Sequence, residues 1–438
     1  MKADKSRIQG VEQSPQSQVT VRRKPFWKPI LRPGQGRKLP PELRPEQVFS
    51  KAEKLHDGLG GRAYEHLIRR IDQSPFHSDT RVEIHASGKS AFDRILQAIN
   101  HAEHEVLIEA YVLRDDRTGH DFLKALESAV ARGVDVKLLA DAFGSSRTGS
   151  DFWRLLKKSG LRLRLFRRPH YAPPSLLPIL DHRKLIIVDR NVAFTGGMNI
   201  ADEYRQGRAG ENAWRDTHIC LQGGIVWELA IIFAEGWSAA GGDPIHFEGL
   251  EPESGKGSKA LVLDARPGRG QNEVFSAFAA TLGAARQSVL ITNAYFAPGR
   301  RMVRLLKRTA ARGVDVRLLL PGYCDLPVIH TATQGYYTEL LSAGVRIFEY
   351  QRSVLHAKTL VADGQVVIIG STNFDFRSFV FNAECNVLFH DRDTAAQMQA
   401  IFEKDLEFAR EVTLETWRQT PWRLRLLARL ARMMAFMM

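Results

Sequence analysis

The sequence contains the stretch His182-Arg183-Lys184-Leu185-Ile186-Ile187-Val188-Asp189, and its pattern returns as His356-Ala357-Lys358-Thr359-Leu360-Val361-Ala362-Asp363. In both stretches Lys stands two residues after His, and Asp stands seven residues after it. Side chains two apart on a strand point to the same face, so each His and Lys should project together from a strand end. A lone His on a strand is more often structural than catalytic, but two complete copies indicate a paired site.

A second strand and a small-residue turn are expected after each motif. Residues 192–195 lead into Gly196-Gly197-Met198-Asn199, and residues 366–369 lead into Gly370-Ser371-Thr372-Asn373. Small residues let the backbone and an Asn side chain approach a ligand closely. Each turn therefore adds a candidate ligand-binding residue, Asn199 or Asn373.

The chain also repeats itself outside these motifs. Residues 131–136 and 311–316 both read Ala-Arg-Gly-Val-Asp-Val, and the apolar run at 106–111 is answered at 289–295. Each half alternates amphipathic segments with short apolar runs, a pattern that predicts α/β layers with buried strands. A repeat of this length indicates duplicated domains, because solenoid repeats have periods of roughly 20–50 residues.

The paired residue types suit the transfer of a phosphodiester. Neutral imidazole can attack phosphorus, and imidazolium can protonate a leaving alkoxide. Two Lys and two Asn would supply positive charge and hydrogen bonds where the transition state gathers negative charge. The lysines stand where a metal ion would stand in a metal-dependent enzyme, so we expect no metal and no other cofactor.

Length and composition fit a two-domain globular protein. The chain has 438 residues, 44% of them hydrophobic and 25% charged. Cys220, Cys324 and Cys385 lie far apart without a CxxC spacing, which predicts neither a disulfide framework nor a zinc site. We expect neither a transmembrane helix nor a signal peptide.

The positive charge is concentrated in the two ends of the chain. Residues 1–40 carry ten Lys or Arg against two acids, and residues 421–438 carry four Arg and no acid. Of the net charge of +13, only +1 remains for the residues between them. A nucleic-acid enzyme usually has basic surface around its groove, so this distribution favours an anionic membrane and argues against nucleic acid.

The motifs resemble those of the phospholipase D superfamily over about residues 80 to 410. The resemblance implies a duplicated α/β/α sandwich: two domains with pseudo-twofold symmetry and one active site between them. It makes His182 the nucleophile that forms a phosphohistidine, and His356 the general acid and then base. It assigns phosphate binding to Lys184, Lys358, Asn199 and Asn373, and support of the histidines to Glu384 and, less directly by its spacing, Asp216. The catalytic motif also includes Asp189 and Asp363, which we expect to brace the strand end.

Among lipid-active members, the turns at 195–201 and 370–378 and the segment Trp214-Arg215-Asp216-Thr217 resemble those of bacterial cardiolipin synthases without N-terminal membrane spans. The resemblance implies transfer of a phosphatidyl group onto phosphatidylglycerol. A hydrolytic phospholipase D and a metal-independent nuclease remain alternatives, because the motif determines the reaction and not the acceptor.

Four segments are expected: 1–75, basic, Pro-rich and partly disordered; 76–250 and 251–410, the two catalytic domains; and 411–438, a basic amphipathic helix. In that helix Trp422, Leu426, Leu430 and Met433 share one side. We expect this side to contact an anionic membrane, the alternative being docking on the enzyme itself. The basic run 22–28 is a second candidate contact. Together these features predict a peripheral protein on the cytoplasmic face of a bacterial inner membrane.

Overall fold

The computed structural model describes residues 39–166, 179–207, 211–247, 256–265 and 273–434. In its first half, strands alternate with helices along the chain. The strands are β1 (His77–His85), β2 (Glu105–Ala110), β3 (Asp135–Asp141), β4 (Arg162–Phe166), β5 (Lys184–Val188), β6 (Val192–Gly196) and β7 (His218–Gln222). The helices are α3 (Gly88–Asn100), α4 (Arg117–Ala131), α5 (Ser150–Lys158), α6 (Asp202–Arg205) and α7 (Ile225–Ala239).

The second half repeats this order. Its strands are β8 (Ser258–Ala265), β9 (Ser288–Asn293), β10 (Asp315–Pro321), β11 (Arg346–Tyr350), β12 (Lys358–Ala362), β13 (Val366–Gly370), β14 (Glu384–His390) and β15 (Ala409–Val412). Its helices are α8 (Glu273–Ala284), α9 (Gly299–Ala311), α10 (Pro327–Gln334), α11 (Tyr337–Leu341), α12 (Phe376–Val380) and α13 (Arg392–Leu406).

All the described strands belong to one sheet of 15 strands, ordered β15-β11-β10-β9-β12-β13-β14-β8-β1-β7-β6-β5-β2-β3-β4. The order on one side of the β8–β1 pair mirrors the order on the other, apart from the extra edge strand β15. Strands β1 and β8 pair antiparallel, as two copies related by a twofold axis between them would. The predicted duplication of an α/β domain is confirmed.

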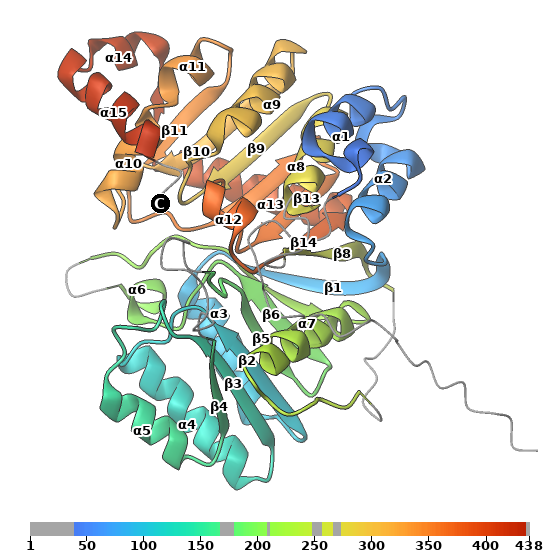
Figure 1. Cartoon of the computed structure of the whole chain (residues 1–438), viewed down its shortest axis with the longest axis vertical. Helices are drawn as coiled ribbons and strands as arrows, with labels where there is room; N and C mark the ends of the chain where they lie inside the picture. The colour runs from blue at the N-terminus through green and yellow to red at the C-terminus, as the bar shows by residue number, and fades with distance from the viewer. Residues whose placement is uncertain (1–38, 167–178, 208–210, 248–255, 266–272, 435–438) are drawn as a thin grey trace, which may run out of the picture.

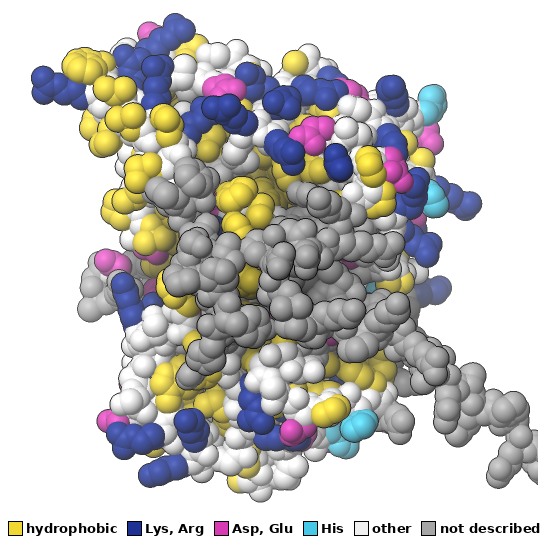
Figure 2. Space-filling model, viewed as in Figure 1, with side chains coloured by type: hydrophobic (Ala, Val, Ile, Leu, Met, Phe, Trp, Pro, Cys, Tyr) yellow, Lys and Arg dark blue, Asp and Glu magenta, His cyan; other side chains and the backbone are white. Residues whose placement is uncertain are grey.

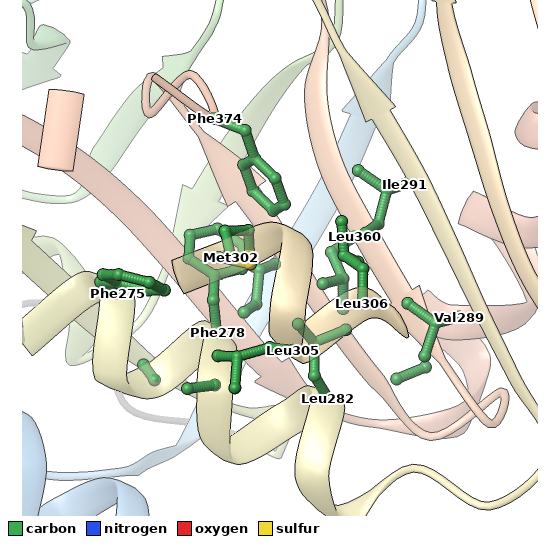
Figure 3. Packing of buried hydrophobic residues seen from close by; sticks show 14 of the residues in the cluster. Phe275, Phe278, Leu282, Val289, Ile291, Met302, Leu305, Leu306, Leu360 and Phe374 are labelled. Carbon is green, nitrogen blue, oxygen red and sulfur yellow. The ribbon is translucent and has the colours of Figure 1, made fainter. Parts of the chain in front are cut away.

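Helices pack along the sheet in both halves (Figure 1), and three apolar clusters lie between them and the sheet. The middle apolar cluster lies on one face of the sheet, spans both halves and includes α7 and α13. The other two lie on the opposite face, one between the first half-sheet and helices such as α3 and α4, the other between the second half-sheet and helices such as α8 and α9 (Figure 3). Burying each large apolar side chain contributes about 1.5–3 kcal/mol, and the shared middle cluster ties the halves together.

Helices before β1 and after β15 pack against the second half of the molecule. Residues 45–72 form α1 (Pro45–Ala52) and α2 (Arg62–Asp72), which contact α8 of the second half. Strand β15 crosses the expected boundary at 411 and pairs with β11. The expected single C-terminal helix is two helices, α14 (Leu414–Gln419) and α15 (Trp422–Met434), because Thr420 and Pro421 separate them. The basic run 22–28 lies outside the described residues.

Helix α15 is attached by a narrow stripe of small residues. Ala428 and Ala431 are buried, and a Cβ at Gly335 would overlap the carbonyl oxygen of Ala428. Trp422, Leu430 and Met433 are 64%, 51% and 71% exposed. Figure 2 shows hydrophobic and basic side chains together over this corner of the molecule. Within the described residues, no helix combines the length and the hydropathy needed to span a bilayer.

Candidate active site

Two isolated backbone bridges place each motif histidine against the opposite half. Asp181 bridges to Ala383, and the His182 amide donates to the Ala383 carbonyl at 2.9 Å. In the same way Arg215 bridges to Leu355, and the His356 amide donates to the Arg215 carbonyl at 2.7 Å. Each histidine therefore enters the half-sheet of its own domain while its backbone is held by the other domain.

The same bridges exchange the supporting carboxylates between the halves. Nδ1 of His182 lies 2.9 Å and 3.1 Å from the two carboxylate oxygens of Glu384. Nδ1 of His356 lies 2.7 Å from Oδ2 of Asp216. All four side chains are buried. A carboxylate at Nδ1 fixes a proton there and leaves Nε2 for the substrate.

The motif lysines lie at the start of β5 and β12, beside the histidines. Lys184 Nζ donates to the His182 carbonyl at 2.8 Å and lies 5.0 Å from the centre of the Tyr111 ring. Lys358 Nζ lies 2.8 Å from Nδ1 and 3.1 Å from Nε2 of His356. Burial lowers the pKa of Lys184 to about 7 and that of Lys358 to about 8, although nearby carboxylates oppose this. An incoming phosphate would favour the charged form of both lysines.

The two turn asparagines occupy different surroundings. Asn199 Oδ1 accepts from the Val112 amide at 3.3 Å, and its Nδ2 donates to the Tyr204 hydroxyl at 2.7 Å. That hydroxyl lies 3.5 Å from Nδ1 of His356. Asn373 is buried, and its Oδ1 has no hydrogen-bond partner among the described residues. The first turn is thus connected to the His356 side of the site through Tyr204.

The motif aspartates lie apart from the motif lysines, each at the other end of its strand. Asp189 and Asp363 follow the far ends of β5 and β12, whereas Lys184 and Lys358 begin these strands. Asp189 accepts from three successive amides, those of residues 103, 104 and 105, at 2.8–2.9 Å. Asp363 does the same with the amides of residues 286, 287 and 288 at 2.8–3.0 Å. Both have a left-handed φ, 49° and 50°, which Asp tolerates in turns.

The two histidine–carboxylate pairs differ in chemistry despite their symmetry. Ser371 Oγ donates to Glu384 at 2.5 Å, whereas Gly197 holds the matching place near Asp216, where a Cβ would overlap Oδ1. Burial raises the pKa of Glu384 to about 7 despite nearby Lys184. Burial also opposes ionisation of Asp216, but Lys358 and His356 lower its pKa below the ordinary value. The carboxylate beside His356 is therefore the more firmly ionised of the two.

The histidines differ in the same direction. Burial and the neighbouring Lys184 and Lys358 hold the pKa of His182 well below its ordinary value. Burial and Lys358 also lower the pKa of His356, but Asp216 raises it in opposition. Both imidazoles thus have a lowered pKa, more strongly so at His182, and at His356 the neighbouring carboxylate opposes the shift.

Aromatic side chains that sequence reasoning did not place in the site surround both rings. Tyr111 packs edge-on against His182 with ring centres 4.6 Å apart, and Tyr295, its counterpart after β9, lies 5.7 Å from His356. Tyr204 and Trp214 lie 5.3 Å and 5.7 Å from the His356 ring. The repeated apolar run ending in Tyr was the available signal for the first two. Phe233 and Trp237 of α7 are buried in the middle apolar cluster.

A buried ion pair beneath His182 crosses between the halves. Arg183 Nη2 donates to Asp264 of β8 at 2.7 Å, and Nη1 donates to Glu109 of β2 at 3.5 Å. All three are at most 6% exposed. The second motif has Ala357 at the position of Arg183. The sequence offered no signal for this contact beyond the difference between the two motifs.

Comparison with known proteins places this geometry in a known class. The structure superposes on a phosphatidylserine synthase of Haemophilus influenzae Rd KW20 with a TM-score of 0.65 at 12% identity, covering 86% of this chain and 100% of that one. This likeness shows a shared fold.

The family is shown by sequence. A model described as "Cardiolipin synthase, PLD-like domain" matches residues 95–215 and 278–406. A cardiolipin synthase of Geobacillus sp. (strain WCH70) is 31% identical over 410 residues, which cover 89% of this chain and 80% of that protein. One of Halalkalibacterium halodurans is 30% identical over 417 residues, or 90% and 81%. The chain belongs to the phospholipase D-like cardiolipin synthase family.

Proposed function

We propose that the protein is a phospholipase D-type phosphatidyltransferase that makes cardiolipin from phosphatidylglycerol. The observation that carries the proposal is the exchanged pair of buried histidines, each with a carboxylate at Nδ1 and a lysine beside it. Family membership supports the substrate class, since relatives named cardiolipin synthase match most of the chain.

In the first step Nε2 of neutral His182 attacks the phosphorus of one phospholipid. The bond from phosphorus to the head-group oxygen breaks, and imidazolium of His356 gives its proton to that oxygen. The products are a phosphatidyl–His182 intermediate and a free alcohol, glycerol where phosphatidylglycerol is the donor. The lower pKa of His182 and the ionised Asp216 beside His356 support this assignment over the reverse.

In the second step neutral His356 removes the proton from the glycerol hydroxyl of a second phosphatidylglycerol. The alkoxide oxygen attacks phosphorus, the bond to His182 breaks, and His356 again carries a proton. Lys184, Lys358, Asn199 and Asn373 would hold the non-bridging phosphate oxygens, whose charge grows in both transition states. Hydrolysis would follow the same path with water as acceptor, so exclusion of water decides the product.

We also propose peripheral attachment to the cytoplasmic face of a bacterial inner membrane through α15. The helix is held by Ala428 and Ala431 and turns its larger apolar side chains outward together with Arg residues. This arrangement suits a segment lying in the interface of an anionic bilayer. One face of α15 docks on the enzyme through Ala428 and Ala431, and its exposed apolar face is free to contact a membrane. The helix is therefore compatible with both expectations.

The test is lipid analysis of the purified enzyme and of host cells. Wild type incubated with phosphatidylglycerol vesicles should yield cardiolipin and an equal amount of glycerol, and His182→Ala should yield neither. Host cells should gain cardiolipin only with the wild type. Mainly phosphatidic acid would show a hydrolase, and cleavage of DNA without added metal would show a nuclease; either result contradicts the proposal.

The intermediate has its own test. Brief reaction with a phosphorus-labelled lipid followed by acid-free digestion should place the label on the peptide that carries His182. Label on the peptide that carries His356 would reverse the two roles.

A further inference from the structure

A basic pocket lies between α9, α11, α12 and the last turns of α15. It has a volume of about 780 Å³, and its walls include Arg300 and Lys307 of α9 and Arg429 and Arg432 of α15. Glu339 is its one acidic wall residue. Apolar surface from Phe376 and Met433 completes it. Four cations against one carboxylate make the pocket a site for an anion.

Two of the four cations are available to a ligand. Lys307 and Arg432 both pair with Glu339, at 3.2 Å and 2.9 Å. Arg432 also packs over the Tyr336 ring, 4.2 Å from its centre, and so helps to attach α15. Among the described residues, neither Arg300 nor Arg429 forms an ion pair, and both are exposed. Arg300 lies in the first turn of α9, where the helix dipole adds attraction for an anion.

The segment that leads into α9 borders both the pocket and His356. Its lining residue Ala297 donates its amide to the Phe374 carbonyl at 2.7 Å and bridges to Asp375. Two residues before Ala297, Tyr295 packs against His356, and one residue before Phe374 stands Asn373. Paired backbones lie only about 5 Å apart, so the chain segments that carry Tyr295 and Asn373 at the reacting centre continue directly into the segments beside the pocket.

We propose that this pocket binds the phosphodiester of the acceptor phospholipid. The inference rests on the proposed function, because a transfer between two phospholipids needs places for two phosphates. The histidine–lysine centre holds the one that reacts. In the acceptor, three glycerol carbons separate the attacking hydroxyl from its own phosphate. Arg300 and Arg429 would hold that second phosphate while the hydroxyl reaches toward His356. The pocket then favours a phospholipid acceptor over water or a neutral alcohol.

The experiment measures how the intermediate partitions between two acceptors. Vesicles of phosphatidylglycerol containing monoacylglycerol offer hydroxyls with and without a phosphate, and both react with the same intermediate. The ratio of cardiolipin to phosphatidyl-monoacylglycerol therefore does not depend on the donor step. Loss of charge-assisted hydrogen bonds to the phosphate in Arg300→Gln/Arg429→Gln should lower this ratio about tenfold.

Two further variants make the result specific. Arg423→Gln removes a charge from α15 outside the pocket, where Arg423 stacks on Trp422, and should keep the ratio within about twofold. Arg300→Lys/Arg429→Lys should restore most of the preference. An unchanged ratio in the Gln double variant, or an equal fall in Arg423→Gln, would overturn the pocket while leaving the proposed function intact. A wild type that forms no cardiolipin would overturn both.

Discussion

At the scale of single residues, the two histidines are distinguished by their carboxylates. Glu384 is longer than Asp216, is held by Ser371, and has a pKa raised by burial to about 7. Asp216 stays ionised because Lys358 and His356 lower its pKa. A firmly ionised carboxylate stabilises imidazolium, and a partly protonated one leaves imidazole neutral. The asymmetry thus suits an acid at His356 and a nucleophile at His182.

This difference predicts the acid side of the pH–rate profile. As the pH falls below about 7, Glu384 gains a proton and loses the negative charge that stabilises the positive charge developing on His182 during attack, so kcat should decline. Glu384→Gln should lower kcat by roughly 10²-fold or more and remove this decline, because Gln does not titrate there. Steady-state turnover of short-chain phosphatidylglycerol from pH 5 to 9 measures both effects.

The matched variant is Asp216→Asn, which acts on the alkaline side. Removing the anion beside His356 lowers the pKa of the imidazolium, so the protonated acid survives only at lower pH. The alkaline decline of kcat should therefore move to lower pH in Asp216→Asn, and the acid decline should stay. If both variants change the same side of the profile, the assigned roles of the two pairs are wrong.

At the scale of secondary-structure elements, each motif strand is functional at one end and braced at the other. Lys184 and Lys358 start their strands at the site, and Asp189 and Asp363 close them by accepting three backbone amides each. A sequence pattern with constant offsets therefore joins a lysine at the site to an aspartate that accepts backbone amides at the far end of the same strand.

Substituting the brace should affect stability more than chemistry. Asp363→Ala leaves three amides of residues 286–288 without their acceptor, and we expect unfolding to need about 2–4 kcal/mol less. The turnover of the folded fraction should stay within a few-fold of wild type. Urea denaturation followed by circular dichroism, combined with active-site titration, measures both. Loss of turnover by 10³-fold with unchanged stability would restore Asp363 to the catalytic residues.

Helix α15 gives a second prediction at this scale. Leu426 and Leu430 are 46% and 51% exposed, and transfer of such side chains into a bilayer interface is favourable by about 1 kcal/mol each at partial burial. Leu426→Gln/Leu430→Gln should weaken binding to anionic vesicles about tenfold, while turnover of dispersed short-chain lipid is unchanged. Leu155→Gln on α5, 42% exposed, is the matched control and should bind normally. Vesicle sedimentation distinguishes these outcomes, and equal binding by all three proteins would exclude α15 as the contact.

At the scale of the whole molecule, the repeat predicts the fold and the members of the site, but not how the halves join. The offsets between His, Lys and Asn are local, so they can be found in the sequence. The pairing of His182 with Glu384 joins residues 202 positions apart. This pairing depends on the β1–β8 junction and on the bridges at Asp181 and Arg215. No periodic pattern in the sequence predicts these contacts. For the same reason no sequence pattern indicates that Arg183 pairs with Asp264 across the halves.

These shared contacts predict that the two halves unfold as one unit. Arg190 and Glu105 form a buried ion pair inside the first half, with the two side chains 5% and 7% exposed. Arg190→Met leaves Glu105 buried without its cation and should cost about 3–5 kcal/mol. Because the middle apolar cluster, the continuous sheet and the exchanged histidine pairs join the halves, this loss should appear equally in β13 of the second half. Hydrogen exchange of the slowest amides of β6 and β13 measures the free energy of opening in each half.

The control is Lys89→Met, which removes the exposed ion pair of Lys89 with Asp93. It should alter neither free energy of opening by more than about 0.5 kcal/mol. If Arg190→Met lowers protection in β6 and leaves β13 at its wild-type value, the halves fold independently and the site is assembled only by their docking.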